Sequence, residues 1–243
     1  MDALIDDPNL VQGSHKACCE CDLGACTMRE LLDVRTVPVR RSLARGDRLS
    51  GDADDGCLKF WIVVRGVAAS CTSFADGRRQ ILALERPGNV ACGLMSVKDA
   101  PSWLEALADC EVCLLDMTPN ARHLREDSSF LHKTFRIAHE RLARAQSQMA
   151  TLGRLDSRER VTLFLAEMAS HSDGGAVTLP MSREDIADYL GLNAETVSRI
   201  LSQLRKAGLV VFLSHTEYVL PDMTAIQRRL PVPIPQAAER NPV

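Results

Sequence analysis

The sequence contains no long hydrophobic run and no secretory signal. None of its apolar stretches approaches the roughly 20 residues that a membrane-spanning helix needs. The opening segment, MDALIDDPNLVQGSHK, has neither a basic start nor an apolar core of the signal-peptide kind. We therefore expect a cytoplasmic protein with no membrane partner, whose thiols are kept reduced.

The chain also lacks a basic excess and any recognisable catalytic pattern. Its formal net charge is −3, so nucleic-acid binding would depend on a local basic face. Among the six histidines no cluster stands out, and the sequence shows no nucleophile–base pair or phosphate-binding glycine loop. We expect a protein that is not an enzyme. The alternative from a different class is an electron carrier or metalloenzyme that uses its cysteines.

Cysteine, by contrast, is abundant and clustered. Four of the nine cysteines fall within HKACCECDLGAC, residues 15–26. In a reducing compartment such a cluster more often binds a metal or acts in redox chemistry than forms disulfides. An odd total also suits a disulfide framework badly. The residues alone leave open an iron–sulfur site, a tetrahedral zinc site, a thiol redox sensor and no metal.

Residues 34–116 contain short β-rich runs separated by turns. Gly66 divides FWIVVRGVAASCTSF into two runs, Asp76-Gly77 forms a turn, and CEVCLLDM is a last apolar strand. This spacing predicts a β-roll or barrel. Alternation along the last strand places Cys110 on a core face and Cys113 on the opposite face, where it could meet an N-terminal segment.

A helical period follows the β-rich region. Apolar residues recur at alternating spacings of four and three over residues 131–152, which is the a/d pattern of a coiled coil. Small Ala138 and Ala145 alternate with large side chains, as a close seam between two helices allows. We predict a homodimer. The predicted interface residues are Leu131, Phe135, Ala138, Leu142, Ala145, Met149 and Leu152.

The segment MSREDIADYLGLNAETVSRILSQLRKAGLV, residues 181–210, predicts two short helices joined by a tight turn. Ser182 and Asn193 are suited to cap the two helices, and Gly191 and Gly208 to end them. LVVFLSHTEYVL then reads as a β-hairpin wing. Two helices with such a turn and wing indicate a winged helix-turn-helix that binds double-stranded DNA.

Three polar side chains are expected on the exposed face of the second helix, close to its N-terminus. They are Glu195, Ser198 and Arg199. Arg can bond to guanine through two hydrogen bonds, Glu can accept a hydrogen bond from cytosine, and Ser can contact either kind of neighbour. We predict that these three residues read the DNA sequence.

The stretch SREDIADYLGLNAETVSRIL resembles the helix-turn-helix of the CRP/FNR family of bacterial transcription regulators. The resemblance covers most of the chain and implies an α+β fold. It comprises an N-terminal cyclic-nucleotide-binding-like β-roll, a long dimerisation helix and a C-terminal winged helix-turn-helix. The expected segments are a cysteine-rich start at 1–30, the β-roll at 31–120, the dimerisation helix at 121–155, the DNA-binding domain at 156–229 and a Pro-rich tail at 230–243.

The FNR branch of the family is the better match. The CRP branch holds cyclic AMP with a Gly-Glu pair and an Arg-Ser, whereas GNVACGLMSVKDAPSWLEAL offers no Arg for the phosphate and no Glu for the ribose. An unpaired anion there would be costly to bury, so no cyclic nucleotide is expected. The CRP branch also has an Arg where this chain has Ala194, and FNR has the Glu, Ser and Arg found here.

FNR senses oxygen with a [4Fe–4S] cluster held by three N-terminal cysteines and one from the β-roll. The resemblance implies Cys18, Cys21, Cys26 and Cys113 as the ligands. The interval between Cys21 and Cys26 is one residue shorter than in FNR, and Cys19 could replace Cys18, although Cys18 keeps the C-x2-C spacing. The alternatives are a zinc or thiol redox sensor and a cluster-less, FixK-like regulator of the same family.

The resemblance also implies a palindromic binding site of the TTGAT type and an activator that works with RNA polymerase. The overall expectation is an oxygen-responsive, anaerobic regulator of transcription. A cyclic-nucleotide-responsive regulator is a further alternative.

Overall fold

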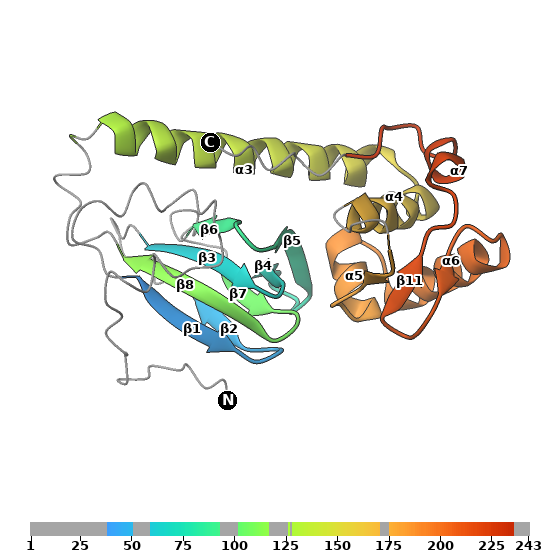
Figure 1. Ribbon diagram of the computed structural model, residues 1–243, viewed down its shortest axis with the longest axis horizontal. Helices are drawn as coiled ribbons and strands as arrows, with labels where there is room; N and C mark the ends of the chain where they lie inside the picture. The colour runs from blue at the N-terminus through green and yellow to red at the C-terminus, as the bar shows by residue number, and fades with distance from the viewer. Residues whose placement is uncertain are drawn as a thin grey trace. The chain divides into compact units, whose positions relative to one another are not determined.

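The computed structural model describes residues 38–50, 59–92, 102–116, 126, 128–170 and 175–235. Several residues discussed above lie outside this part of the chain. They are Cys18, Cys19, Cys21, Cys26 and Cys57, the stretch 93–101 and the end of the tail at 236–243. Figure 1 shows the order of the described elements.

Two four-stranded sheets build the N-terminal domain (Figure 1). The first has the strand order β1 (Val39–Leu43), β8 (Cys110–Asp116), β3 (Lys59–Arg65) and β6 (Val90–Cys92). The second has the order β2 (Arg48–Ser50), β7 (Ser102–Ala106), β4 (Ala68–Ser73) and β5 (Arg79–Glu85). The neighbours within the first sheet pair antiparallel, as do β2 and β7.

Apolar side chains from both sheets form one shared core, as expected for a β-roll. The core consists of Leu43, Trp61, Val63, Ala68, Ala91, Leu104, Ala106, Cys110 and Val112. The break predicted at Gly66 is confirmed between β3 and β4. Gly66 has a φ of +82°, and a Cβ there would lie 2.5 Å from the backbone oxygen of Asp109, so no larger residue fits.

Helix α3 (Ser128–Arg154) is a single helix of 27 residues. Its buried residues are Phe130 and Ile137, whereas Phe135 and Met149 in the predicted seam are each 71% exposed. No described helix is long and apolar enough to cross a membrane.

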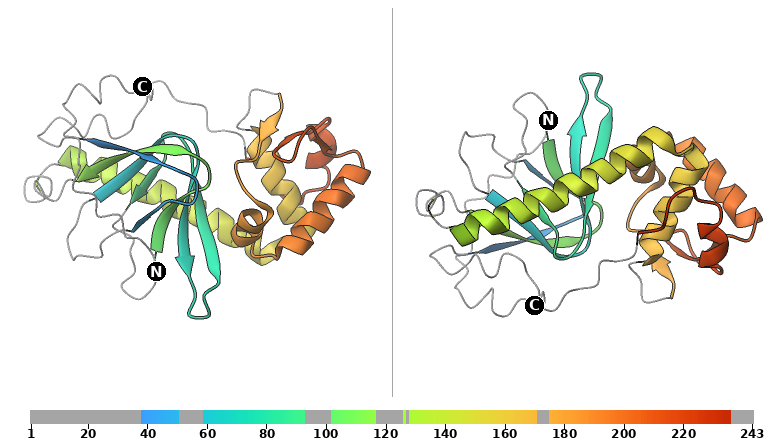
Figure 2. Two further views of the ribbon diagram at one scale, coloured as in Figure 1. Left: turned by 90° about the horizontal axis from the view of Figure 1, so that it is seen from below. Right: turned by 90° about the horizontal axis from the view of Figure 1, so that it is seen from above.

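The C-terminal elements pack around α4 (Ser157–Ser170), α5 (Arg183–Leu190) and α6 (Ala194–Lys206), which form a compact group in Figure 2. A three-stranded sheet of β10 (Val211–Phe212), β11 (Glu217–Val219) and β9 (Val177–Thr178) forms the wing, and α7 (Met223–Gln227) follows. The hydroxyl of the fully buried Tyr218 donates to the backbone oxygen of Leu165 at 2.6 Å. This bond anchors the wing to α4.

The described residues form two compact units, divided within α3 after Ile137. The unit that contains the winged helix-turn-helix also includes residues 71–83, which form the end of the β4–β5 hairpin. The sequence-based boundaries differ here, because they place the whole hairpin in the β-roll domain.

The first residues of the tail are also held in place. The side chain of Gln227 bonds to the backbone of Val232 and Ile234, both at 2.9 Å.

Candidate nucleic-acid interface

The first helix of the pair, α5, begins and ends as its sequence predicts. Ser182 is the N-cap, and its hydroxyl accepts a hydrogen bond from the backbone of Asp185, whose carboxylate accepts one from the backbone of Ser182. This reciprocal capping box satisfies two backbone N–H groups that the helix leaves unpaired. Gly191 ends the helix at a φ of +63°, where a side chain would be strained.

The second helix, α6, is equally well defined by local signals. The side chain of Asn193 accepts from the backbone of Thr196 at 2.7 Å and caps the helix. Gly208, just beyond the helix, has a φ of +69°. The predicted inward-facing residues are all buried: Ile186, Ala187 and Leu190 on α5, and Val197, Ile200, Leu201 and Leu204 on α6. The helix-turn-helix prediction is therefore confirmed.

The three predicted base-reading residues lie on the exposed side of α6. Glu195, Ser198 and Arg199 are all exposed, and they fall within its first two turns. Spacings of three and four residues place them on one face of the helix. The side chains of Glu195 and Arg199 can therefore reach the same neighbourhood on a bound duplex.

A groove of about 460 Å³ runs between this face and the start of α4. Arg199 and Gln203 line it from α6, and Ser157 and Arg158 line it from α4. The sequence analysis did not identify the α4 residues as part of the site. The signal available was the stretch DSRE, because Asp156 and Glu159 exchange hydrogen bonds of 2.8 Å across the start of the helix. That capping box fixes Arg158 in the first turn, where it is exposed.

Arg160 connects three helices at their ends. Its guanidinium donates to the backbone oxygens of Leu152 at 2.6 Å, Leu155 at 2.9 Å and Leu190 at 3.1 Å. These carbonyls follow the last turns of α3 and α5, where helices leave backbone acceptors unpaired. Arg160 thus holds α5 against the junction of α3 and α4, a role that no local sequence signal predicts.

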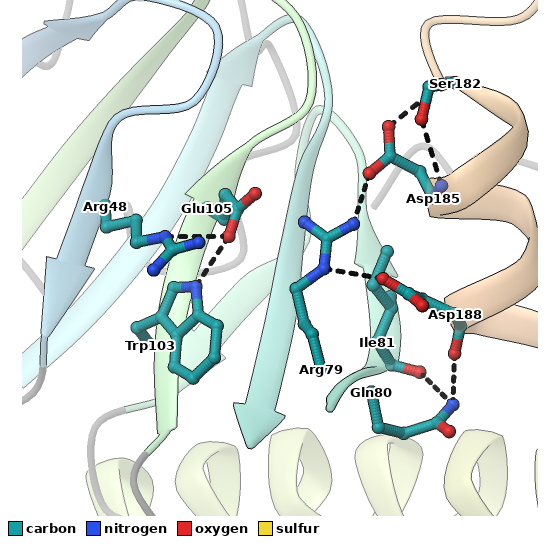
Figure 3. Close-up of polar contacts among 9 residues, drawn as sticks. All are labelled: Arg48, Arg79, Gln80, Ile81, Trp103, Glu105, Ser182, Asp185 and Asp188. Carbon is teal, nitrogen blue, oxygen red and sulfur yellow. Dashed lines mark hydrogen bonds and ion pairs between the residues drawn. The ribbon is translucent and has the colours of Figure 1, made fainter. Parts of the chain in front are cut away.

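Residues 79 and 80 of the β4–β5 hairpin contact α5, as Figure 3 shows. Arg79 is paired with Asp185 and, at 2.8 Å, with Asp188. Burial by itself raises the pKa of Asp185 and is the largest single influence. Hydrogen bonds from Ser182 and Arg79 outweigh it, so that the pKa lies below its ordinary value. Asp185 is therefore a carboxylate at neutral pH.

Arg183 links the start of α5 to the wing. Its guanidinium lies 5.5 Å from the centre of the Phe212 ring, a cation–π distance. Burial lowers the pKa of Arg183, although a guanidinium stays charged at neutral pH.

The predicted metal ligands fall partly outside the described residues. Cys113 lies on β8, opposite Arg40 of β1 and Ile62 of β3. Cys110 and Val112 are in the shared core, which confirms their face of the strand, and Cys113 on the other face is 8% exposed. Cys71, Cys110 and Cys113 form no disulfide, and within the described part of the chain no three His, Cys, Asp or Glu residues could hold a metal ion.

Comparison with known proteins agrees with this architecture. Residues 159–229 match the model of the Crp-like helix-turn-helix domain. The nitrogen fixation regulation protein FixK of Azorhizobium caulinodans is 34% identical, with 76% of each chain covered. The transcriptional activator protein FnrL of Cereibacter sphaeroides is 27% identical, with 87% of each chain covered.

Among solved structures, FixK2 from Bradyrhizobium japonicum is similar over 81% of this chain and 99% of its own, at 33% identity and a TM-score of 0.72. Regulators of this family bind DNA and act as dimers. The matching domain, the sequence identity and the fold lead to one conclusion: the chain belongs to the CRP/FNR family of transcription regulators.

Proposed function

We propose that the protein is an oxygen-responsive transcription activator that reads a TTGAT-type palindrome as a homodimer. One observation carries the DNA-reading part: Glu195, Ser198 and Arg199 are exposed together on the first turns of a helix that caps and packing hold in place. A helix presented in this way fits the major groove of B-DNA with its N-terminal residues at the base edges.

The chemistry of the three side chains assigns a base to each. Arg199 pairs with the guanine of the half-site through two hydrogen bonds, and Glu195 accepts from the cytosine amino group. Ser198 favours the second thymine. Arg158, on the other side of the groove, contacts the phosphate backbone, because a guanidinium from another helix meets the duplex beside the recognition helix and not within its groove.

The dimer proposal rests on α3. Leu131, Phe135, Leu142 and Met149 are 47–71% exposed in the single chain, although each is a large apolar side chain. Exposed apolar residues repeating along one stripe of a long helix are covered when a second copy packs against them. A two-fold symmetric dimer then presents two α6 helices to successive major grooves.

The oxygen response is proposed to depend on a [4Fe–4S] cluster held by Cys18, Cys21, Cys26 and Cys113. The described ligand fits this role in its donor type and position, because Cys113 offers a soft sulfur ligand on the face of β8 opposite the shared core. The same face carries Arg40, paired with Glu111 at 3.0 Å. A cluster would supply oxygen-labile iron–sulfur bonds there, and the cysteine side chains would tie the N-terminal segment to β8.

A second candidate function is a cluster-less regulator of the same family. Its support is the burial of Cys113 by more than nine-tenths, which suits a small apolar residue as well as a ligand, and the similarity to proteins named FixK. Zinc binding or thiol oxidation at the N-terminal cysteines belongs to the same alternative. Iron, zinc and acid-labile sulfide analysis of anaerobically purified protein distinguishes these cases.

The DNA-reading proposal is tested by titrating duplexes with two variants. Arg199→Ala should cost about 1–3 kcal/mol at the inverted TTGAT repeat and much less when the guanine–cytosine pair is replaced, because only the first duplex loses a bidentate bond. Arg158→Ala is the matched control. Its loss should weaken both duplexes equally and make the salt dependence shallower by about one per phosphate contact. An equal loss of affinity for Arg199→Ala on both duplexes would contradict the base-reading role.

A further inference from the structure

The hairpin contact on α5 is concentrated on one helical turn. Arg79 bonds to the carboxylates of Asp185 and Asp188, and the side chain of Gln80 donates to the backbone oxygen of Asp188 (Figure 3). Residues 185 and 188 are three apart and share one face of α5. Two consecutive residues of β5 therefore hold one face of the first helix.

This ion-pair cluster is mostly shielded from solvent. The side chains of Arg79, Asp185 and Asp188 are 19%, 10% and 30% exposed. A surface ion pair contributes little, but removing one partner from a buried cluster leaves a charge that neither water nor a counter-charge stabilises. The neighbouring Arg78 offers a contrast, because its side chain is 80% exposed and pairs with Asp76 inside the same turn.

The two helices of the pair respond together to any force on α5. They share a buried face that includes Ile186, Leu190, Val197 and Leu201, and Gly191 fixes the turn between them. Close packing of this kind transmits a displacement of one helix to the other. Holding α5 therefore sets the position of α6, while Glu195 and Arg199 stay exposed.

The contact also continues along the chain into the β-roll. Arg79 is the first residue of β5, which is an edge strand of the sheet β2-β7-β4-β5. The hydrogen bonds to α5 are thus made by a strand that belongs to the sensor sheet.

From these contacts we propose that Arg79 is a positioning residue for DNA recognition: through Asp185 and Asp188 it fixes the helix-turn-helix on the end of the β4–β5 hairpin in the arrangement that binds DNA. The proposal rests on the role of α6 in reading the duplex. It assigns to Arg79 no contact with DNA.

The test measures the affinity of the full-length dimer for a duplex with an inverted TTGAT repeat. Arg79→Gln and Asp188→Asn should each weaken binding about tenfold, and the double variant should be no weaker than either single one, because both remove the same interaction. Arg79→Lys should restore binding in part, since one ammonium retains the charge but cannot match the fork of a guanidinium. The control Arg78→Gln should bind like the unmodified protein.

Hydrogen exchange of the protein without DNA separates this proposal from the choice of half-site. The backbone amides of 183–190 should exchange several-fold faster in Arg79→Gln and at the unmodified rate in Arg78→Gln. Failure of the unmodified protein to bind the duplex would contradict the proposed half-site and leave the exchange result to decide on the contact. Unchanged exchange, additive losses in the double variant, or tighter DNA binding by Arg79→Gln would overturn the positioning role.

Discussion

Two cysteines on one strand illustrate how position decides what a residue can do. Cys110 and Cys113 both lie on β8 and both are buried. Burial, with smaller contributions from Asp47 and Asp109, raises the pKa of the Cys110 thiol, which disfavours the thiolate that a metal needs. Cys113 faces away from that core. The residue scale therefore favours Cys113 over Cys110 as the ligand from the β-roll.

This assignment predicts the effect of single substitutions on the chromophore. Cys113→Ser should abolish the broad visible absorbance of anaerobically purified protein, because a hydroxyl is a poor ligand for iron. Cys71→Ser is the control, since Cys71 is 1% exposed and packs as a small apolar residue. Visible spectra and iron content measure the result. A cluster that survives in Cys113→Ser would exclude this residue as the fourth ligand.

At the scale of elements, α3 has a length and a surface that its own chain does not use. It keeps an apolar stripe exposed over 27 residues, and only two of its described side chains are buried. A helix of this length in water gains its stability from packing, so the stripe indicates a missing neighbour.

Leu142→Glu tests this interface directly. Symmetry places the two introduced carboxylates close to each other in the seam, and burying an unpaired charge costs roughly 3–5 kcal/mol. We expect the dimer to shift strongly toward monomer in sedimentation or light scattering. Ala143→Glu adds the same charge one position along, outside the a/d stripe, and should leave the mass unchanged. A dimeric Leu142→Glu protein would show that residues 131–152 pack against something else.

At the scale of the whole molecule, the proposed function couples a sensor to a dimer that reads DNA. An intact cluster biases the protein toward the dimer, and loss of the cluster removes the bias. A ligand can shift such an equilibrium only by its differential affinity for the two states, and typical couplings change affinity about 5–150-fold.

Exposure to air should therefore weaken DNA binding of the anaerobically purified protein by at least about fivefold. Parallel titrations before and after exposure, with absorbance followed on the same sample, measure this change. The Cys113→Ser protein is the control and should show the weaker affinity in both conditions. If air leaves the affinity of the unmodified protein unchanged, the cluster-less alternative is the correct one.

Much of this protein was readable from the sequence because the signals are local. Ser182, Gly191, Asn193 and Gly208 act within a few residues of their own positions, so the helix-turn-helix and its buried faces follow from spacing and capping chemistry. The break at Gly66 is of the same kind. Exposure of Glu195, Ser198 and Arg199 follows once the apolar face of α6 is known.

Tertiary structure alone decided the contacts that join distant segments. Arg79 and Asp185 are separated by 106 positions, and Arg160 reaches a backbone oxygen 30 positions away. Neither arginine stands out in the sequence, because a guanidinium on a strand or helix looks like any solvated charge until its partners are placed. Arg158 joins the groove for the same reason, since the packing of α4 against α6 creates that groove. Local patterns specify elements, whereas the meeting of elements depends on the packing of the whole core, which no short stretch encodes.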